Sequence, residues 1–397
     1  MEDSMLRLLQ DYLAINTVHP HADYQAVIAL FKKQALADGF SMREIILPSG
    51  YPVLVITLEG SDPSLPALAL NHHMDVVPAD NAAQWDFPPF EGSVHDERIY
   101  GRGTQDCKGL GVAHYAALRE LKERGIQPAR TIHCIMVPDE ERGGYEGAKE
   151  FTAHPDFASL NIGFVLDEGM PSGNEQLLLL KIDERTPIQL RVTSVGPQGH
   201  ASGIRHENCI HTLTQFLADV TQFHATQKQL AADDQPGHLI SMHITSVNAH
   251  NTALNVIPAH ANATIDMRIP SHISAAHAIE IIDRLMAPYP SLQYEILATS
   301  KERLRAISVD VPFYRILADI VTQRGLTPQP FAFEATTDAR FYSHKGIATI
   351  GFTPFTVAPN LHGTNEYIQM SDLRNGIAIM YDFLQAFCMA NNERELS

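Results

Sequence analysis

An apolar strand that runs into three adjacent carboxylates constrains this chain more than any other stretch. Residues 131–137 (TIHCIMV) are apolar and rich in β-branched side chains, which predicts a buried strand. Pro138 cannot continue a central strand, so the strand should end there. Asp139, Glu140 and Glu141 then lie at its carboxyl end, directly before two glycines. Inside a cleft their mutual repulsion must be offset by a metal ion, an arginine or water, whereas in an ordinary acidic surface turn solvent is sufficient.

Composition narrows the classes of protein to which the chain can belong. Its 397 residues, 45% apolar and 19% charged, suit two domains with sizeable cores. A net charge of −17 without a basic stripe disfavours binding to nucleic acid or to anionic membranes. The amino terminus has no secretory signal pattern, no apolar run is long enough to cross a bilayer, and the four cysteines form no CxxC pair. We therefore expect a soluble, cytoplasmic protein with reduced thiols.

Strands alternate with helices along most of the chain, which predicts a three-layer α/β domain. The strand pattern at 65–70 is nearly all apolar, as in the centre of a sheet. We expect helices at 4–15, 23–38, 108–124, 144–151, 312–324 and 372–391, and strands at 51–58, 65–70, 131–137, 162–166 and near Phe331 and Ala348.

The segment 186–299 has a different texture. Its first ten residues alternate polar and apolar side chains, which predicts a half-exposed antiparallel strand. The order strand-helix-strand-strand-helix-strand follows, as in a ferredoxin-like α+β unit. We therefore predict a discontinuous domain over 1–185 and 300–397 and an inserted domain over 186–299. The expected strands of the insert are 186–195, 239–246, 260–268 and 292–297, and its helices are 207–223 and 275–286.

Histidines and carboxylates recur just after the predicted strands. His73 and Asp75 follow the second strand, and two side chains one residue apart on an extended chain point the same way. His73 can then bind a metal while Asp75 supports it, although a capped loop histidine is the ordinary alternative. Asp106 opens a helix, where an N-cap is the ordinary role. Glu168 follows another strand, and His362 lies in a turn-rich loop.

The shared placement of these residues favours a metal site over the separate alternatives. Ligand sites in open α/β sheets gather at the carboxyl ends of strands. Two histidines and three carboxylates complete a pair of zinc ions that share one bridging carboxylate.

A series of short motifs supports this interpretation. In order they are HMDVVP (73–78), WDFPPFEG (85–92), YGRGTQDCKG (100–109), PDEERGG (138–144), LDEG (166–169), GHAS (199–202), NVIP (255–258), TDAR (337–340) and HGTNE (362–366). The series resembles the di-zinc aminoacylase/carboxypeptidase metallohydrolase family from the first predicted helix to the last. The LDEG form is similar to the aminoacylase branch. The resemblance implies an α/β fold, with a three-layer zinc-exopeptidase-like catalytic domain and an inserted ferredoxin-like lid and dimerisation domain.

The resemblance also implies two zinc ions per subunit. Asp106 would bridge both ions, and its peptide bond to Cys107 would be cis. The remaining ligands would be His73 and Glu168 for one ion, and Glu141 and His362 for the other. Cys107 stands where relatives usually have methionine; we favour a small buried hydrophobe there over a stray zinc ligand.

Three further roles follow from the resemblance. Glu140 would be the general base that activates a metal-bridging water, and Asp75 would support His73. His200 would stabilise the oxyanion in the active site of the neighbouring subunit of a homodimer formed through the inserted domain. A loop histidine held by the Ser202 hydroxyl is the alternative for His200.

The substrate's free carboxylate needs a cation, and Arg340 is our candidate because a guanidinium holds a carboxylate with two parallel hydrogen bonds. Its alternative is a surface ion pair on a helix. Asn255 either donates to the substrate or caps a turn.

We therefore predict zinc-dependent hydrolysis of the amide bond of small N-acyl-L-amino acids. A dipeptidase or other exopeptidase of the same family stays open, because the sequence does not tell an acyl pocket from an anchor for a charged amino terminus. A non-catalytic binding protein is disfavoured because every ligand is present. A thiol hydrolase is disfavoured because Cys134 lies inside an apolar strand.

Overall fold

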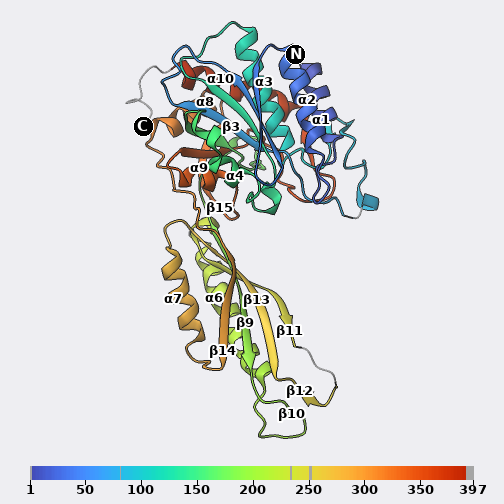
Figure 1. The fold of residues 1–397 in the computed structure, drawn as a ribbon, viewed down its shortest axis with the longest axis vertical. Helices are drawn as coiled ribbons and strands as arrows, with labels where there is room; N and C mark the ends of the chain where they lie inside the picture. The colour runs from blue at the N-terminus through green and yellow to red at the C-terminus, as the bar shows by residue number, and fades with distance from the viewer. Residues whose placement is uncertain (1, 81, 233–234, 250–252, 390–397) are drawn as a thin grey trace. The chain divides into compact units, whose positions relative to one another are not determined.

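The computed structural model describes residues 2–80, 82–232, 235–249 and 253–389 (Figure 1). The chain divides into two compact units. The first comprises the residues up to Ile182, Ile307–Pro330 and those from Thr337 on, and the second comprises Asp183–Ala306 and Phe331–Thr336.

The first unit is built on an eight-stranded mixed sheet whose order is β1-β2-β6-β3-β7-β16-β8-β15. The strands β6, β3, β7 and β16 run parallel, and the remaining pairs recorded, β1 with β2, β2 with β6 and β16 with β8, are antiparallel. The strands are β1 (Ser41–Ile46), β2 (Pro52–Leu58), β3 (Ala67–His73), β6 (Ile132–Val137), β7 (Ile162–Asp167), β8 (Leu177–Glu184), β15 (Thr327–Phe333) and β16 (Ala348–Phe352). A small sheet adds β4 (Ser93–His95), β5 (Arg98–Tyr100) and β17 (Tyr367–Gln369).

Helices cover both faces of this sheet, so the predicted three-layer arrangement is confirmed (Figure 1). Alternate strand residues point to opposite faces. Leu68 and Leu70 of β3 join one core with α1, α2, α3, α8 and α10, whereas Ala69 joins the other with α4, α5 and α9. The helices are α1 (Glu2–Leu13), α2 (Tyr24–Ala37), α3 (Lys108–Glu123), α4 (Ala148–Ala153), α5 (Pro155–Ala158), α8 (Pro312–Gln323), α9 (Ala339–His344) and α10 (Met370–Met389).

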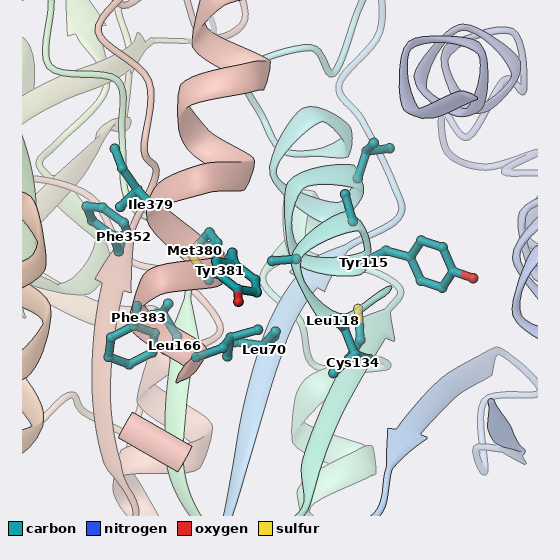
Figure 2. Close-up of a cluster of buried hydrophobic side chains, with 14 of the residues drawn as sticks. Leu70, Tyr115, Leu118, Cys134, Leu166, Phe352, Ile379, Met380, Tyr381 and Phe383 are labelled. Atoms are coloured by element: carbon teal, nitrogen blue, oxygen red, sulfur yellow. The ribbon is translucent and has the colours of Figure 1, made fainter. Parts of the chain in front are cut away.

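The larger core lies between the sheet and the helices α3 and α10, as Figure 2 shows. Leu70, Cys134 and Leu166 come from three neighbouring strands, and they meet Leu118 of α3 and Phe383 of α10. All five side chains are fully buried. Burying a side chain of this size contributes about 1.5–3 kcal/mol, so this layer holds the central strands in a fixed register.

The second unit has the ferredoxin-like order predicted for it. Its four-stranded antiparallel sheet runs β11-β13-β9-β14, which leaves β11 and β14 at the edges. The elements are β9 (Thr186–Val195), α6 (Cys209–Leu230), β11 (Ser241–Asn248), β13 (His260–Ile269), α7 (Ala275–Met286) and β14 (Leu292–Thr299). A short pair, β10 (Gly199–His200) and β12 (Val256–Ile257), lies outside this sheet.

Most predicted elements occur within a few residues of their expected bounds. The strand before the acidic motif ends at Val137, as Pro138 requires. The predicted end of the last helix, Asn391, lies outside the described residues. Strands β1 and β8 were not expected from the sequence. None of the helices in the described part of the chain combines the length and apolar character that crossing a bilayer requires.

Candidate active site

Three parallel strands end at the same edge of the first unit's sheet and present the predicted ligands there. His73 is the last residue of β3 and lies opposite Val137, the last residue of β6. Glu140 and Glu141 follow β6 in a single 3₁₀ turn, Glu140–Arg142, and Glu168 follows β7 directly. The topology therefore brings together residues that are far apart in the sequence. They meet at the carboxyl ends of neighbouring parallel strands, where ligand sites of α/β sheets are expected.

The first group of potential ligands consists of His73, Asp106, Cys107 and Glu168, all of them buried. His73 Nε2 lies 2.9 Å from Asp106 Oδ1 and 3.2 Å from Glu168 Oε2. The peptide bond between Asp106 and Cys107 is cis, as the resemblance implied. Burial raises the pKa of the Cys107 thiol, and its sulfur contacts the main chain of His73, 3.3 Å from the nitrogen. These contacts favour the interpretation of Cys107 as a small buried hydrophobic residue over its interpretation as a zinc ligand.

The second group consists of Asp106, Glu141 and His362. His362 Nε2 lies 3.2 Å from Asp106 Oδ2 and 3.2 Å from Glu141 Oε2. Asp106 thus turns one carboxylate oxygen toward each group, which is the arrangement that a carboxylate bridging two ions requires. All five predicted metal ligands are brought together.

The electrostatics of the two groups show a need for positive charge. Burial raises the pKa of Glu168 to about 7, and burial also raises that of Glu141. Hydrogen bonds to Asp106 and Glu141 raise the pKa of His362 to about 10. Burial alone would raise the pKa of Asp106, but hydrogen bonds from His362 and His73 outweigh it and lower that pKa. Imidazole and carboxylate donors packed this closely fit zinc, whose charge would offset the carboxylates.

Among the described residues, Glu140 belongs to neither ligand group. Burial raises the pKa of its carboxyl, and the nearby charge of Glu168 adds to this effect. A carboxyl of raised pKa, close to the ligands but outside them, suits proton transfer.

Asp75 contacts the site in a way that the sequence did not indicate. His73 Nδ1 lies 2.9 Å from the main-chain oxygen of Asp75, whereas the carboxylate oxygen Oδ1 lies 3.8 Å away. The carboxylate accepts the backbone N–H groups of Glu140 and Glu141 at 3.2 and 3.0 Å. Asp75 therefore supports His73 through its backbone and holds the acidic turn through its side chain.

Arg340 lies behind the acidic turn and is only 4% exposed, so the alternative of a surface ion pair does not hold. Its guanidinium donates to the carbonyl oxygens of Thr337 at 2.6 Å and Gly143 at 2.5 Å. Asp338 is buried beside it, and neither of its carboxyl oxygens has a hydrogen-bond partner within the described part of the chain.

His200 and Asn255 belong to the second unit, where the chain brings them together. His200 pairs with Val256 in the β10–β12 ladder, and its Nε2 lies 3.1 Å from Asn255 Nδ2. His200 Nδ1 lies 2.8 Å from the Ser202 hydroxyl, which is the contact expected of a held loop histidine. The side chain is nevertheless exposed, and its role stays a prediction.

Several buried or half-buried groups near the ligands were not expected from the sequence. Asp338 and Glu366 each occur in a motif quoted above, TDAR and HGTNE, but neither was given a role. Arg102 is 3% exposed and pairs with Glu366, and His19 lies 3.7 Å from both Asp75 and Asp139. Arg102 also lies in a quoted motif, YGRGTQDCKG. Apart from these three motifs, no local pattern indicates the contacts, because each joins distant parts of the chain.

The chain is similar to known proteins over nearly its whole length. Residues 69–386 match peptidase family M20/M25/M40. Mouse aminoacylase-1 is 32% identical over 393 residues, which cover 97% of this chain and 95% of the mouse protein. Aminoacylase-1 of Dictyostelium discoideum is 29% identical over 395 residues, which cover 95% of this chain and 96% of that protein. These relatives match the aminoacylase branch that the motifs indicated.

Solved structures show the same fold. A metallo-carboxypeptidase of the M20 family from Sulfolobus solfataricus has a TM-score of 0.77 at 16% identity, covering 98% of this chain and 100% of its own. Human carnosine dipeptidase 1 has a TM-score of 0.70 at 15% identity, with coverages of 98% and 97%. At such identities the likeness extends to the fold alone.

Proposed function

The chain belongs to peptidase family M20/M25/M40 and is a metal-dependent hydrolase, and we propose that it hydrolyses the amide bond of N-acyl-L-amino acids. The observation that carries the proposal is the 32% identity to mouse aminoacylase-1 over 97% of the chain. The products would be a carboxylate and a free L-amino acid. A cytoplasmic location fits such small substrates, and the free buried thiols of Cys107, Cys134 and Cys209 support it.

In this proposal the two ligand groups would hold two zinc ions. His73 and Glu168 would hold one ion, Glu141 and His362 would hold the other, and both ions would share Asp106. Asp106 turns Oδ1 toward His73 and Oδ2 toward His362, which supports this division. When bound, the ions would polarise the substrate carbonyl and lower the pKa of water to about 7.

Glu140 is the proposed general base. It takes a proton from the attacking water and passes it to the leaving amine, which requires a carboxyl that is close to the ligands but is not one of them. The Asp75 carboxylate accepts the backbone N–H groups of Glu140 and Glu141 and so fixes the turn that carries them. In the proposal this fixed turn lets Glu140 act as the base while Glu141 acts as a metal ligand.

Arg340 is the proposed partner of the substrate carboxylate. A guanidinium has five donors. The structure records one hydrogen bond from each of Nη1 and Nη2 to a carbonyl, and each of these nitrogens carries a second N–H for a ligand. Its burial strengthens a charge-assisted contact, because water competes less well there.

The second unit is the proposed lid and dimerisation domain. Its edge strands carry exposed apolar side chains, among them Val247 on β11 and Ile296 and Leu297 on β14. Exposed edges of this kind invite pairing with another chain. A two-fold dimer through such an edge would present His200 to the partner's active site as an oxyanion donor, with Asn255 beside it.

A dipeptidase or other exopeptidase activity is the runner-up, which the match to a peptidase family favours. The two activities differ in what precedes the scissile amide: an acyl group in one case, a charged amino group in the other.

A substrate panel separates them. The zinc-loaded protein is assayed with N-acetyl-L-methionine and with dipeptides that share its carboxyl-terminal methionine, so that the acyl side alone varies. The proposal expects the higher kcat/KM for the N-acetyl substrate. A higher kcat/KM for the dipeptides would favour the runner-up, and hydrolysis of neither would contradict both.

A further inference from the structure

A single buried carboxylate, that of Glu366, gathers the backbone of the segment that leads to Asp106. Glu366 is fully buried. Its Oε1 accepts the N–H groups of Gln105 at 2.7 Å, Gly103 at 3.2 Å and Asp106 at 3.3 Å. Its Oε2 accepts Gly103 N–H at 3.1 Å and Nη1 of Arg102 at 2.7 Å. Successive N–H groups that converge in this way form an anion-binding concavity, here filled by the protein's own carboxylate.

Arg102 extends this arrangement to the loop that carries His362. The guanidinium donates through Nη1 to Glu366 and through Nη2 to the main-chain oxygen of His362 at 3.1 Å. Its carbon Cζ lies 5.3 Å from the centre of the Trp85 ring. The planar fork thus spans two partners at fixed positions, which a lysine ammonium cannot do.

His362 has a backbone that needs such support. Its φ is +63°, in the left-handed region. That conformation costs a non-glycine residue about 1–2 kcal/mol, so contacts outside the residue must stabilise it. The described contacts include the bond from Arg102 to its carbonyl oxygen.

We propose that Arg102 and Glu366 are a pair of positioning residues that fix the backbone of Asp106 and His362, and thereby set the spacing of the second metal group. The inference rests on the proposed function, because it concerns the same site. Glu366 of the HGTNE motif and Arg102 of the YGRGTQDCKG motif thereby gain a role. In this role neither side chain contacts the metal or the substrate.

The geometry explains why both charges are needed. Three backbone N–H groups converge on Oε1 of Glu366 while Arg102 donates to Oε2, so both oxygens of the carboxylate are used, and a buried carboxylate requires a partner charge. Removing either member leaves the charge of the other buried without its partner charge, which destabilises the backbone arrangement that the pair holds. Partners that orient metal ligands typically change metal affinity by about 10–100-fold when they are lost.

The test uses the full-length protein and its zinc affinity. Arg102→Met keeps the packing of the stem and removes the donors, and Glu366→Gln keeps one acceptor oxygen and removes the charge. Arg98→Met is the matched control. It makes the same substitution in strand β5, where Cζ of Arg98 lies 4.7 Å from the centre of the Tyr367 ring. Its recorded side-chain hydrogen bond goes to Tyr100, and within the described part of the chain none joins it to the loop of Asp106 or of His362.

Zinc dissociation constants are measured by competition with a chromophoric chelator. We expect one of the two zinc ions to be held about 10–100-fold more weakly in Arg102→Met and Glu366→Gln. In Arg98→Met both constants should stay at the wild-type values. If Arg102→Met does not fold, Arg102→Lys provides the same comparison, because an ammonium can pair with Glu366 without spanning to His362.

The melting temperature of each metal-free variant separates positioning from general stability. Variants that melt earlier yet bind both zinc ions as the wild type does would show a purely structural role and overturn the inference. Wild-type protein that binds no zinc would contradict the proposed function itself, which is a different result.

Discussion

Gly144, the second glycine after the acidic turn, is the position where the packing behind the site can be tested most sharply. Its φ is +63°, and a Cβ added there would lie 2.0 Å from Asp338 Oδ1 and 2.9 Å from Phe341 Cε2. Real Cβ atoms do not approach so closely, so Gly144→Ala must displace the buried Asp338 or the turn that carries Glu140 and Glu141.

Gly125→Ala is the matched control. Gly125 follows α3 with φ of +68°, and a Cβ there would meet nothing within 4 Å. In both variants the left-handed backbone costs about 1–2 kcal/mol. A less flexible unfolded chain offsets about 0.4–1 kcal/mol of this. Only Gly144→Ala adds overpacking, which costs about 1–3 kcal/mol. The control should therefore lose about 1 kcal/mol, and Gly144→Ala about 2–4 kcal/mol.

The single tryptophan makes the assay specific to the first unit. Trp85 is the only tryptophan of the chain and is 8% exposed, so its fluorescence during urea denaturation follows the unfolding of the unit that holds the site. Zinc content is measured on the same samples, and we expect it to fall in Gly144→Ala alone.

A double variant shows whether Asp338 is the cause. With Asp338→Ala already present, Gly144→Ala should cost less than it does in the otherwise wild-type chain, because the clash with the carboxyl is gone and only the closer approach to Phe341 remains. Equal unfolding midpoints for Gly144→Ala and Gly125→Ala in the otherwise wild-type chain would refute the reasoning.

Four further variants test the assigned roles. Glu140→Ala should retain zinc while kcat falls by about 10²-fold or more, whereas Glu141→Ala should lose zinc; equal loss of metal in both would refute the division of labour. Arg340→Lys should raise KM for N-acetyl amino acids, because a point charge cannot replace a planar fork, and an unchanged KM would remove Arg340 from the carboxylate site. His200→Ala should lower kcat by about 10²-fold at constant zinc content, and mixing it with Glu140→Ala under subunit exchange should restore part of the activity if His200 acts across the dimer. Confirmed exchange without recovered activity would rule that out.

The strands that the sequence predicts accurately are those whose bounds are set by a local residue pattern. Pro138 marks the end of β6 because proline cannot extend a central strand, and the alternation over 186–195 marks β9 to the residue. By contrast, β1 (SMREII) is half polar and exists through its ladder with β2, and β8 begins as an unbroken run of leucines with no alternation. Pairing across the sheet, rather than the local pattern, decides such strands.

The candidate site likewise has residues that a local pattern indicates and residues that only the fold brings together. Three of the five predicted ligands, His73, Glu141 and Glu168, lie at or just after the carboxyl end of a strand, whereas Asp106 and His362 lie in neighbouring loops. The structure brings all five into two groups. The partners of these ligands have no such local pattern. Arg102 and Glu366 are 264 residues apart, and Asp75 meets the acidic turn 65 residues further along the chain. Only the fold shows that Glu366 accepts backbone N–H groups next to Asp106 and that Asp75 accepts those of the acidic turn.

Zinc titration of the metal-free protein tests the central claim most directly. The protein is stripped with a chelator, zinc is added back in steps, and hydrolysis of N-acetyl-L-methionine is followed at each step. We predict no activity without metal and activity that rises until two zinc ions are bound per chain, because His73, Asp106, Glu141, Glu168 and His362 form two groups that share one carboxylate. Full activity in the metal-free protein would contradict the account.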